Sequence, residues 1–217
     1  MFKALPCQNS RVDSRPGTLC YGIERVERLG APRAIRGWKM SEQEVEAFFD
    51  IGTQYYVAAR YAAFAGLAPV CANLFHHAVE MYMKGYLSSQ RGLAELKKLG
   101  HRLPDIWTHF KASVADAELD RFDPVISELD KFESIRYPDR VLTEGMQLSV
   151  SMGKPHSGQG GLGSIRPEPL CQITVEDMDH LITTIFRKAV GNTRYFTARL
   201  NSDATTYLYR ANQALPT

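Results

Sequence analysis

The stretch PVCANLFHHAVEMYMKGYLSSQR, from Pro69 to Arg91, decides the fold of this chain because its apolar residues recur at helical spacing. Apolar side chains stand three or four positions apart, at Cys71, Leu74, Phe75, Ala78, Tyr82 and Tyr86. This period places them on one helix face, which can pack into a core. A second line along the same helix carries polar side chains, namely Asn73, His77, Glu80, Lys84 and Arg91. We therefore predict a long central helix with one apolar face and one polar stripe.

A second long helix is predicted immediately before this one, from Ser41 to about Ala65. Ser41-Glu42-Gln43-Glu44 has the capping-box pattern, in which the serine hydroxyl and the glutamate satisfy free backbone amides at the helix start. Gly66 is expected to end this helix and Pro69 to begin the next. Because the link is so short, the two helices must run antiparallel. The sequence therefore predicts a helical hairpin.

The rest of the chain adds shorter helices and one β segment. Helical spacing returns in later stretches, at 93–99, 104–114, 124–135 and 175–190, and a short helix is expected within 203–214. Residues 146–152 instead alternate apolar and polar side chains, which is the period of a strand. Residues 170–173 are the expected partner. We predict an all-α fold, an antiparallel helical bundle with a small β-hairpin insertion at about 145–173.

Composition divides the chain into three parts. Residues 1–40 hold eight Lys/Arg and only three Asp/Glu, show neither helical nor strand period, and are expected to be an irregular or disordered basic extension. Residues 41–191 are the predicted helical domain, and 192–217 a C-terminal extension. Beyond residue 40 the acidic residues slightly outnumber the basic ones, which disfavours non-specific binding to duplex DNA.

The cysteines and the hydropathy pattern indicate a cytoplasmic protein. The four cysteines form no CxxC pair and have no metal-ligand spacing, which is typical of reduced thiols. No stretch reaches the roughly 18 consecutive apolar residues of a membrane-spanning helix. The N-terminal residues lack the apolar centre of a secretory signal. We therefore expect no association with a membrane.

Familiar catalytic motifs are missing or misplaced. Residues 158–163 match the pattern GxGxxG, but the residues Ile165-Arg166-Pro167-Glu168-Pro169 that follow cannot form the helix that a dinucleotide site requires. A flexible hairpin loop explains these glycines better. The chain has no Gly-x-Ser-x-Gly elbow, and no cysteine has an obvious histidine partner. The sequence therefore predicts neither a cofactor nor a hydrolase with a Ser or Cys nucleophile.

His76, His77 and Glu80 raise the question of a metal site. His77 and Glu80 share a helix face, but the chain has no HExxH motif and no second pair of ligands can be identified. Hydrogen bonding at the helix surface and a Glu80–Lys84 ion pair are the favoured interpretation. No metal is predicted.

Three motifs, in this order, resemble the HEPN superfamily (higher eukaryotes and prokaryotes nucleotide-binding). Phe75–Leu87 resembles its second long helix, with Glu80 and Lys84 in the E-x-x-x-K positions. Gly100-His101-Arg102-Leu103 resembles the GH-x-L turn that often follows, and Ile135-Arg136-Tyr137-Pro138-Asp139 resembles the xRYP end of a later helix. The resemblance covers about residues 44–190. It implies a helical bundle that commonly dimerises and that often binds or acts on RNA.

The resemblance also suggests which residues bind a ligand. Lys84 and Arg136 are the candidates for contact with phosphate, and Tyr137 is the candidate for stacking on a base. Glu80 and His101 complete the predicted ligand-binding set. The leading expectation is a non-catalytic, homodimeric HEPN-like module that binds nucleic acid, a nucleotide or a protein partner.

Two alternatives stay open. Ribonuclease members of the superfamily use an Arg-x4-6-His motif, and Arg102 and His109 have that spacing. They straddle the GH-x-L turn, however, and Arg136 has no histidine within reach. A metal-independent ribonuclease of toxin type, with a nucleotidyltransferase-type antitoxin as its partner, is therefore the first alternative. The second is a purely structural interaction domain, in which Glu80, Lys84 and Arg136 form an internal salt-bridge network.

Overall fold

A computed structural model describes residues 41–135, 148–153, 171–191, 193–198 and 200–215. All of them belong to one compact unit, Ile35–Thr217. The predicted basic extension, residues 1–40, lies outside the described residues, as do most of the residues between 136 and 170. In the described residues, helices predominate, as the sequence predicted.

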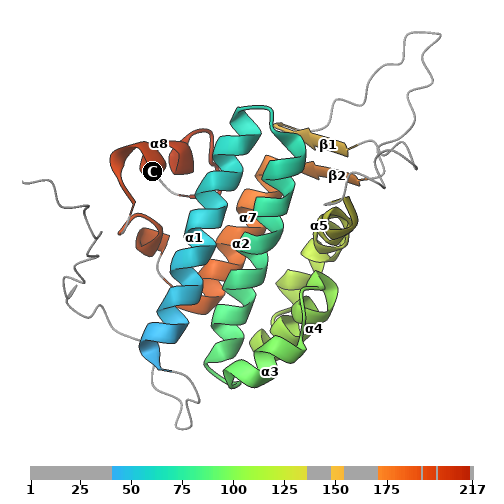
Figure 1. The fold of residues 1–217 in the computed structure, drawn as a ribbon, viewed down its shortest axis with the longest axis vertical. Helices are drawn as coiled ribbons and strands as arrows, with labels where there is room; N and C mark the ends of the chain where they lie inside the picture. The colour runs from blue at the N-terminus through green and yellow to red at the C-terminus, as the bar shows by residue number, and fades with distance from the viewer. Residues whose placement is uncertain (1–40, 136–147, 154–170, 192, 199, 216–217) are drawn as a thin grey trace, which may run out of the picture. The chain divides into compact units, whose positions relative to one another are not determined.

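Two long helices, α1 (Glu42–Phe64) and α2 (Ala68–Ser88), form the predicted hairpin. Figure 1 shows them side by side, joined by a tight link. The capping box at the start of α1 is present, since the Glu44 amide donates to Ser41 Oγ at 3.3 Å and the Ser41 amide donates to Glu44 Oε2 at 2.9 Å. Gly66 has a φ of +73°, a left-handed conformation that favours glycine and that lets the chain reverse.

The remaining helices follow in chain order, and the five α-helices among them were expected from the sequence. They are α3 (Leu93–Lys98), α4 (Leu103–Val114), the 3-10 helix η1 (Ala117–Phe122), α5 (Asp123–Ile135), α7 (Val175–Val190), the 3-10 helix η2 (Thr193–Phe196) and α8 (Ser202–Tyr209). Helix α2 contacts α1, α4, α5 and α7, so it occupies the central position that its sequence predicted. Helix α3 lies at the end of α2 and leads into α4 (Figure 1).

The small sheet differs from the prediction. Strands β1 (Leu148–Ser151) and β2 (Cys171–Thr174) pair in parallel, with Leu148 opposite Cys171, so the predicted β-hairpin is wrong. A hairpin requires antiparallel strands, whereas parallel strands need a connection of roughly a dozen residues or more. Residues 152–170, which separate the strands, meet that need. The glycine-rich run that the sequence assigned to a hairpin loop lies within residues 154–170, outside the described residues.

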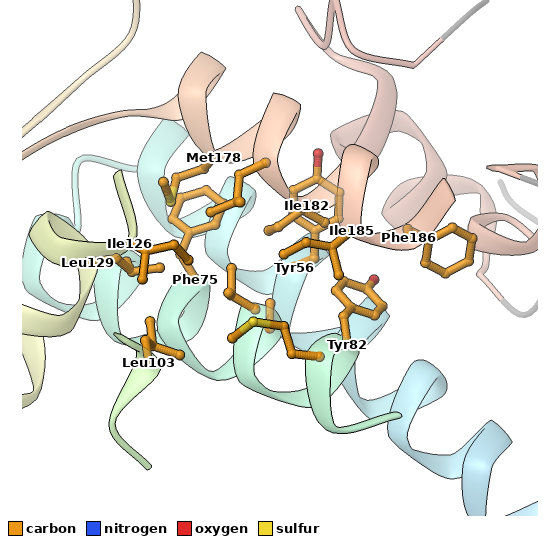
Figure 2. Packing of buried hydrophobic residues seen from close by; sticks show 14 of the residues in the cluster. Tyr56, Phe75, Tyr82, Leu103, Ile126, Leu129, Met178, Ile182, Ile185 and Phe186 are labelled. Atoms are coloured by element: carbon orange, nitrogen blue, oxygen red, sulfur yellow. The ribbon is translucent and has the colours of Figure 1, made fainter. Parts of the chain in front are cut away.

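The core lies where α2 meets α1, α4, α5 and α7. Figure 2 shows apolar side chains from these helices packed against one another, among them Tyr56, Phe75, Tyr82, Leu103, Ile126, Leu129, Met178, Ile182, Ile185 and Phe186. Each of these side chains is almost fully shielded from solvent. The rings of Phe186 and Phe196 stack with centroids 3.9 Å apart, which ties the segment after α7 to the same core.

Gly52 is a position where α1 and α2 approach each other closely. A methyl group there would lie 2.9 Å from Cε1 of Tyr82, a fully buried ring whose hydroxyl donates to Thr53 Oγ1 at 3.0 Å. Overpacking of this kind costs about 1–3 kcal/mol, and the gain in helix propensity from alanine offsets about 1 kcal/mol of it. We expect Gly52→Ala to lower the free energy of unfolding by about 1 kcal/mol, measured by urea denaturation.

A double variant identifies the cause of that loss. If the Tyr82 ring is the obstacle, Gly52→Ala combined with Tyr82→Leu should lose less stability than the two single losses together. Strictly additive losses would show that the added methyl group clashes with a group other than the Tyr82 ring.

Candidate functional site

Glu80 on α2 lies at the centre of a buried polar network. Its side chain is almost fully shielded from solvent, and its Oε1 accepts a hydrogen bond from Lys84 Nζ at 2.7 Å. His101 Nδ1 lies 2.9 Å from the same oxygen, a hydrogen bond when that nitrogen carries a proton. The structure thus brings together three of the residues that the sequence predicted to bind a ligand.

Lys84 connects this network to the turn before α4. Its Nζ also donates to the Gly100 carbonyl at 2.6 Å, and only 8% of its side chain is exposed. Gly100 has a φ of +64°, which favours glycine, and His101 and Arg102 follow directly before the first turn of α4. The ion pair on α2 therefore holds the turn from which α4 begins.

The surroundings of Glu80 keep its carboxylate ionised. Burial by itself would raise the pKa of Glu80, but the neighbouring His77 and Lys84 side chains, together with the charge of His101, lower that pKa to about 2. The group is therefore an anion at neutral pH. The ordinary pKa of a glutamate is about 4.3.

The second carboxylate oxygen of Glu80 has a different environment. Within the part of the chain that the structure describes, Oε2 is buried and accepts no hydrogen bond. His77 Nδ1 lies 3.7 Å from it, and the His77 ring packs against Tyr55 with centroids 5.2 Å apart. One nitrogen of His76, one of His77 and a Glu80 oxygen all lie within 4.8 Å of one another, so these residues are the ones that could hold a metal.

The two weak catalytic candidates, Arg102 and His109, have different partners. Arg102 is 73% exposed and forms an ion pair with Asp105 at 3.4 Å. His109 Nδ1 instead lies 3.1 Å from Nη2 of Arg91, just beyond the end of α2. Among the described residues, no hydrogen bond or ion pair joins Arg102 to His109. The structure therefore contains an Arg–His pair, but its arginine is Arg91.

Two predicted ligand-binding residues, Arg136 and Tyr137, lie outside the described residues. Their predicted roles in contacting phosphate and stacking on a base stay predictions, as does the tie from Glu80 and Lys84 towards Arg136.

A second buried network was not predicted from the sequence. Arg60 on α1 is fully buried, forms an ion pair with Asp179 on α7, and donates from Nε to the Tyr207 carbonyl at 3.0 Å. The Tyr56 hydroxyl donates to Asp179 at 2.7 Å and accepts from Asn212 Nδ2 at 2.9 Å. Burial raises the pKa values of both Tyr56 and Asp179. Because this network is shielded from solvent, we assign it to stability.

The described cysteines are poor nucleophiles. Cys71 and Cys171 are free and buried, and burial raises the pKa of each thiol to about 12. A thiol with such a pKa is protonated at neutral pH and does not attack a substrate. Neither Cys71 nor Cys171 is therefore a candidate nucleophile.

These features define a mainly helical domain with a small parallel sheet, one buried Glu–Lys–His network and one half-buried Arg–His pair. No family model, no curated protein and no solved structure matches the chain. In the described segments, every helix is too short or too polar to cross a membrane.

Proposed function

We propose that this chain is a HEPN-like helical module that binds the phosphate groups of RNA or of a nucleotide. The observation that supports this proposal best is the contact between Arg91 and His109. Both side chains are only half-buried, so a ligand can reach them from solvent. The proposal adds Arg91 to the residues that the sequence singled out for phosphate contact.

Arg91 keeps its charge available for an anion. Its hydrogen-bond partner is an imidazole, and no carboxylate among the described residues pairs with it. A guanidinium has five N–H donors in a planar fork, which suits two oxygens of one phosphate. His109 adds a polar nitrogen beside that fork.

Nearby lysines add to the positive charge of this end of the domain. Lys97 and Lys98 lie on α3, between Arg91 and His109 in the chain, and both are exposed. In the described segments neither is in an ion pair. Clustered cations of this kind bind nucleic-acid phosphates and make the affinity dependent on salt.

The Glu80 network supports this site rather than forming it. Lys84 directs two of its three N–H groups to Glu80 and to the Gly100 carbonyl, and its side chain is almost fully buried. Its ammonium group is therefore poorly placed to bind a phosphate. By holding the turn at Gly100, it positions the start of α4, on which His109 lies two turns later. We assign Lys84 to positioning.

We expect Arg91→Ala to weaken binding of a short single-stranded RNA by about tenfold or more at low salt, since one direct charge contact to phosphate is lost. Fluorescence anisotropy with a labelled oligonucleotide measures this, and the melting temperature should stay within about 1–2 °C of the wild-type value. Increasing salt should weaken wild-type binding more steeply than binding by the variant.

Arg102→Ala is the matched control, because it removes an equally charged and more exposed side chain from the same end of the domain. If only the total positive charge of the domain mattered, Arg91→Ala and Arg102→Ala would weaken RNA binding equally. Equal effects of the two substitutions, or no RNA binding by the wild type, would contradict a phosphate site at Arg91.

Ribonuclease activity is the second candidate function, favoured by the same contact between Arg91 and His109. An imidazole beside a guanidinium can act as an acid or base on a 2′-hydroxyl while the arginine holds the phosphate. Incubation of the same RNA with purified protein in EDTA tests it. Cleavage that is lost in His109→Ala but kept in Arg102→Ala would support an enzyme. If the wild-type protein leaves the RNA intact, binding without cleavage is the remaining function.

A further inference from the structure

We propose that His76, His77 and Glu80 form a binding site for a divalent transition-metal ion of the zinc type. All three residues lie on α2, with Glu80 four positions after His76 and three after His77. Residues at these spacings lie on the same side of a helix. The sequence alone favoured simple hydrogen bonding here, because the burial of the Glu80 carboxylate cannot be read from the spacing.

The distances between the ligand atoms suit one ion. The three atoms lie within 4.8 Å of one another, and His77 Nδ1 is 3.7 Å from Glu80 Oε2. Ligands about 2.1 Å from a tetrahedral zinc ion are about 3.4 Å apart. The His77–Glu80 distance is close to that value, and separations of up to 4.8 Å require the imidazoles to rotate toward the ion when it binds.

The unused oxygen of Glu80 is the second observation that points to a ligand. Oε2 is buried, and within the described residues it accepts no hydrogen bond. Lys84 and His101 both contact the other oxygen, Oε1. A buried anionic oxygen without a donor is costly, and a cation on Oε2 would remove that cost.

The donor set determines the kind of metal. Two imidazole nitrogens and one carboxylate oxygen suit zinc and its neighbours, and oxygen-seeking ions such as magnesium and calcium use other ligands. Three protein ligands leave a fourth position open, and the half-buried His77, with 26% of its side chain exposed, provides access. The Lys84 ammonium on Oε1 opposes the ion, so we expect weaker binding than at a closed structural zinc site.

The test uses the full chain, treated with EDTA, exchanged into metal-free buffer and titrated with zinc chloride in a calorimeter. We expect one equivalent bound by the wild type and an affinity at least about tenfold lower for His77→Ala. His180→Ala, which removes an exposed imidazole from α7, is the matched control and should keep the wild-type affinity. Cobalt(II) as a probe should give a visible absorption band in the wild type that His77→Ala lacks.

Melting curves of the metal-free variants check that each is folded, and His77→Gln replaces His77→Ala if the alanine variant is not. No binding of zinc by the wild type would overturn the proposal. Equal affinities of the wild type and a folded His77 variant would also overturn it, since other side chains would then hold the ion. RNA binding at Arg91 is measured separately, so either result leaves the phosphate site undecided.

Discussion

Replacing Arg60 by alanine is expected to lower the free energy of unfolding by about 3–5 kcal/mol, because the substitution leaves a buried charge without its partner. Arg60 is fully buried and Asp179, its ion-pair partner, is 2% exposed. After the change the Asp179 carboxylate keeps only the Tyr56 hydroxyl as a hydrogen-bond donor among the described residues. Denaturation in urea, followed by circular dichroism, measures the loss.

The loss should be greatest in the C-terminal segment. Arg60 also donates to the carbonyls of Tyr207 and Arg210, which belong to α8 and the residue after it. Both carbonyls lose their donor when the guanidinium is removed. We expect residues 200–215 of the variant to exchange their amide protons faster than the rest of the domain.

Two controls separate charge burial from the loss of side-chain volume. Arg121→Ala breaks an exposed ion pair with Glu118 and should cost less than about 1 kcal/mol. The double variant Arg60→Met with Asp179→Leu removes both buried charges and fills the space, so it should be more stable than Arg60→Ala. A double variant no better than the single one would show that the ion pair itself stabilises the fold.

The elements that could be predicted are those that depend on local interactions. The start of α1 follows from Ser41 and Glu44, whose contacts span three residues. The start of α7 follows in the same way from Thr174, whose Oγ1 accepts from the Asp177 amide at 3.1 Å. The direction of β2 relative to β1 has no such local signal, because alternation is the same in parallel and antiparallel strands.

The contacts of the candidate site also differ in whether local spacing in the sequence predicts them. The Glu80–Lys84 pair is a contact between positions four apart on a helix, so spacing alone predicts it. The Arg91–His109 contact joins residues 18 apart, across α3 and its turns, and no helical period indicates it. One signal for Arg60 is present in the sequence: it lies next to Ala59 and one turn after Tyr56, two residues that the structure buries. A charged residue at such a position requires a buried partner.

Replacing Lys84 by methionine decides between its two roles. If Lys84 positions the turn at Gly100, the variant leaves the buried Glu80 carboxylate with His101, whose side chain is 68% exposed, as its nearest remaining partner. Methionine keeps the apolar stem of lysine, so packing is largely preserved. We expect the free energy of unfolding to fall by about 3 kcal/mol, measured by urea denaturation in the presence of EDTA.

Adding Glu80→Gln to Lys84→Met removes the stranded charge, so the double variant should recover part of that stability. The RNA affinity of Lys84→Met, measured at a temperature where the variant is folded, should fall less than that of Arg91→Ala. The opposite pattern, an unchanged free energy of unfolding with RNA binding lost, would make Lys84 the phosphate contact that the sequence suggested. The two roles differ because an ammonium that already holds Glu80 and Gly100 cannot turn to a phosphate without leaving both of them unpaired.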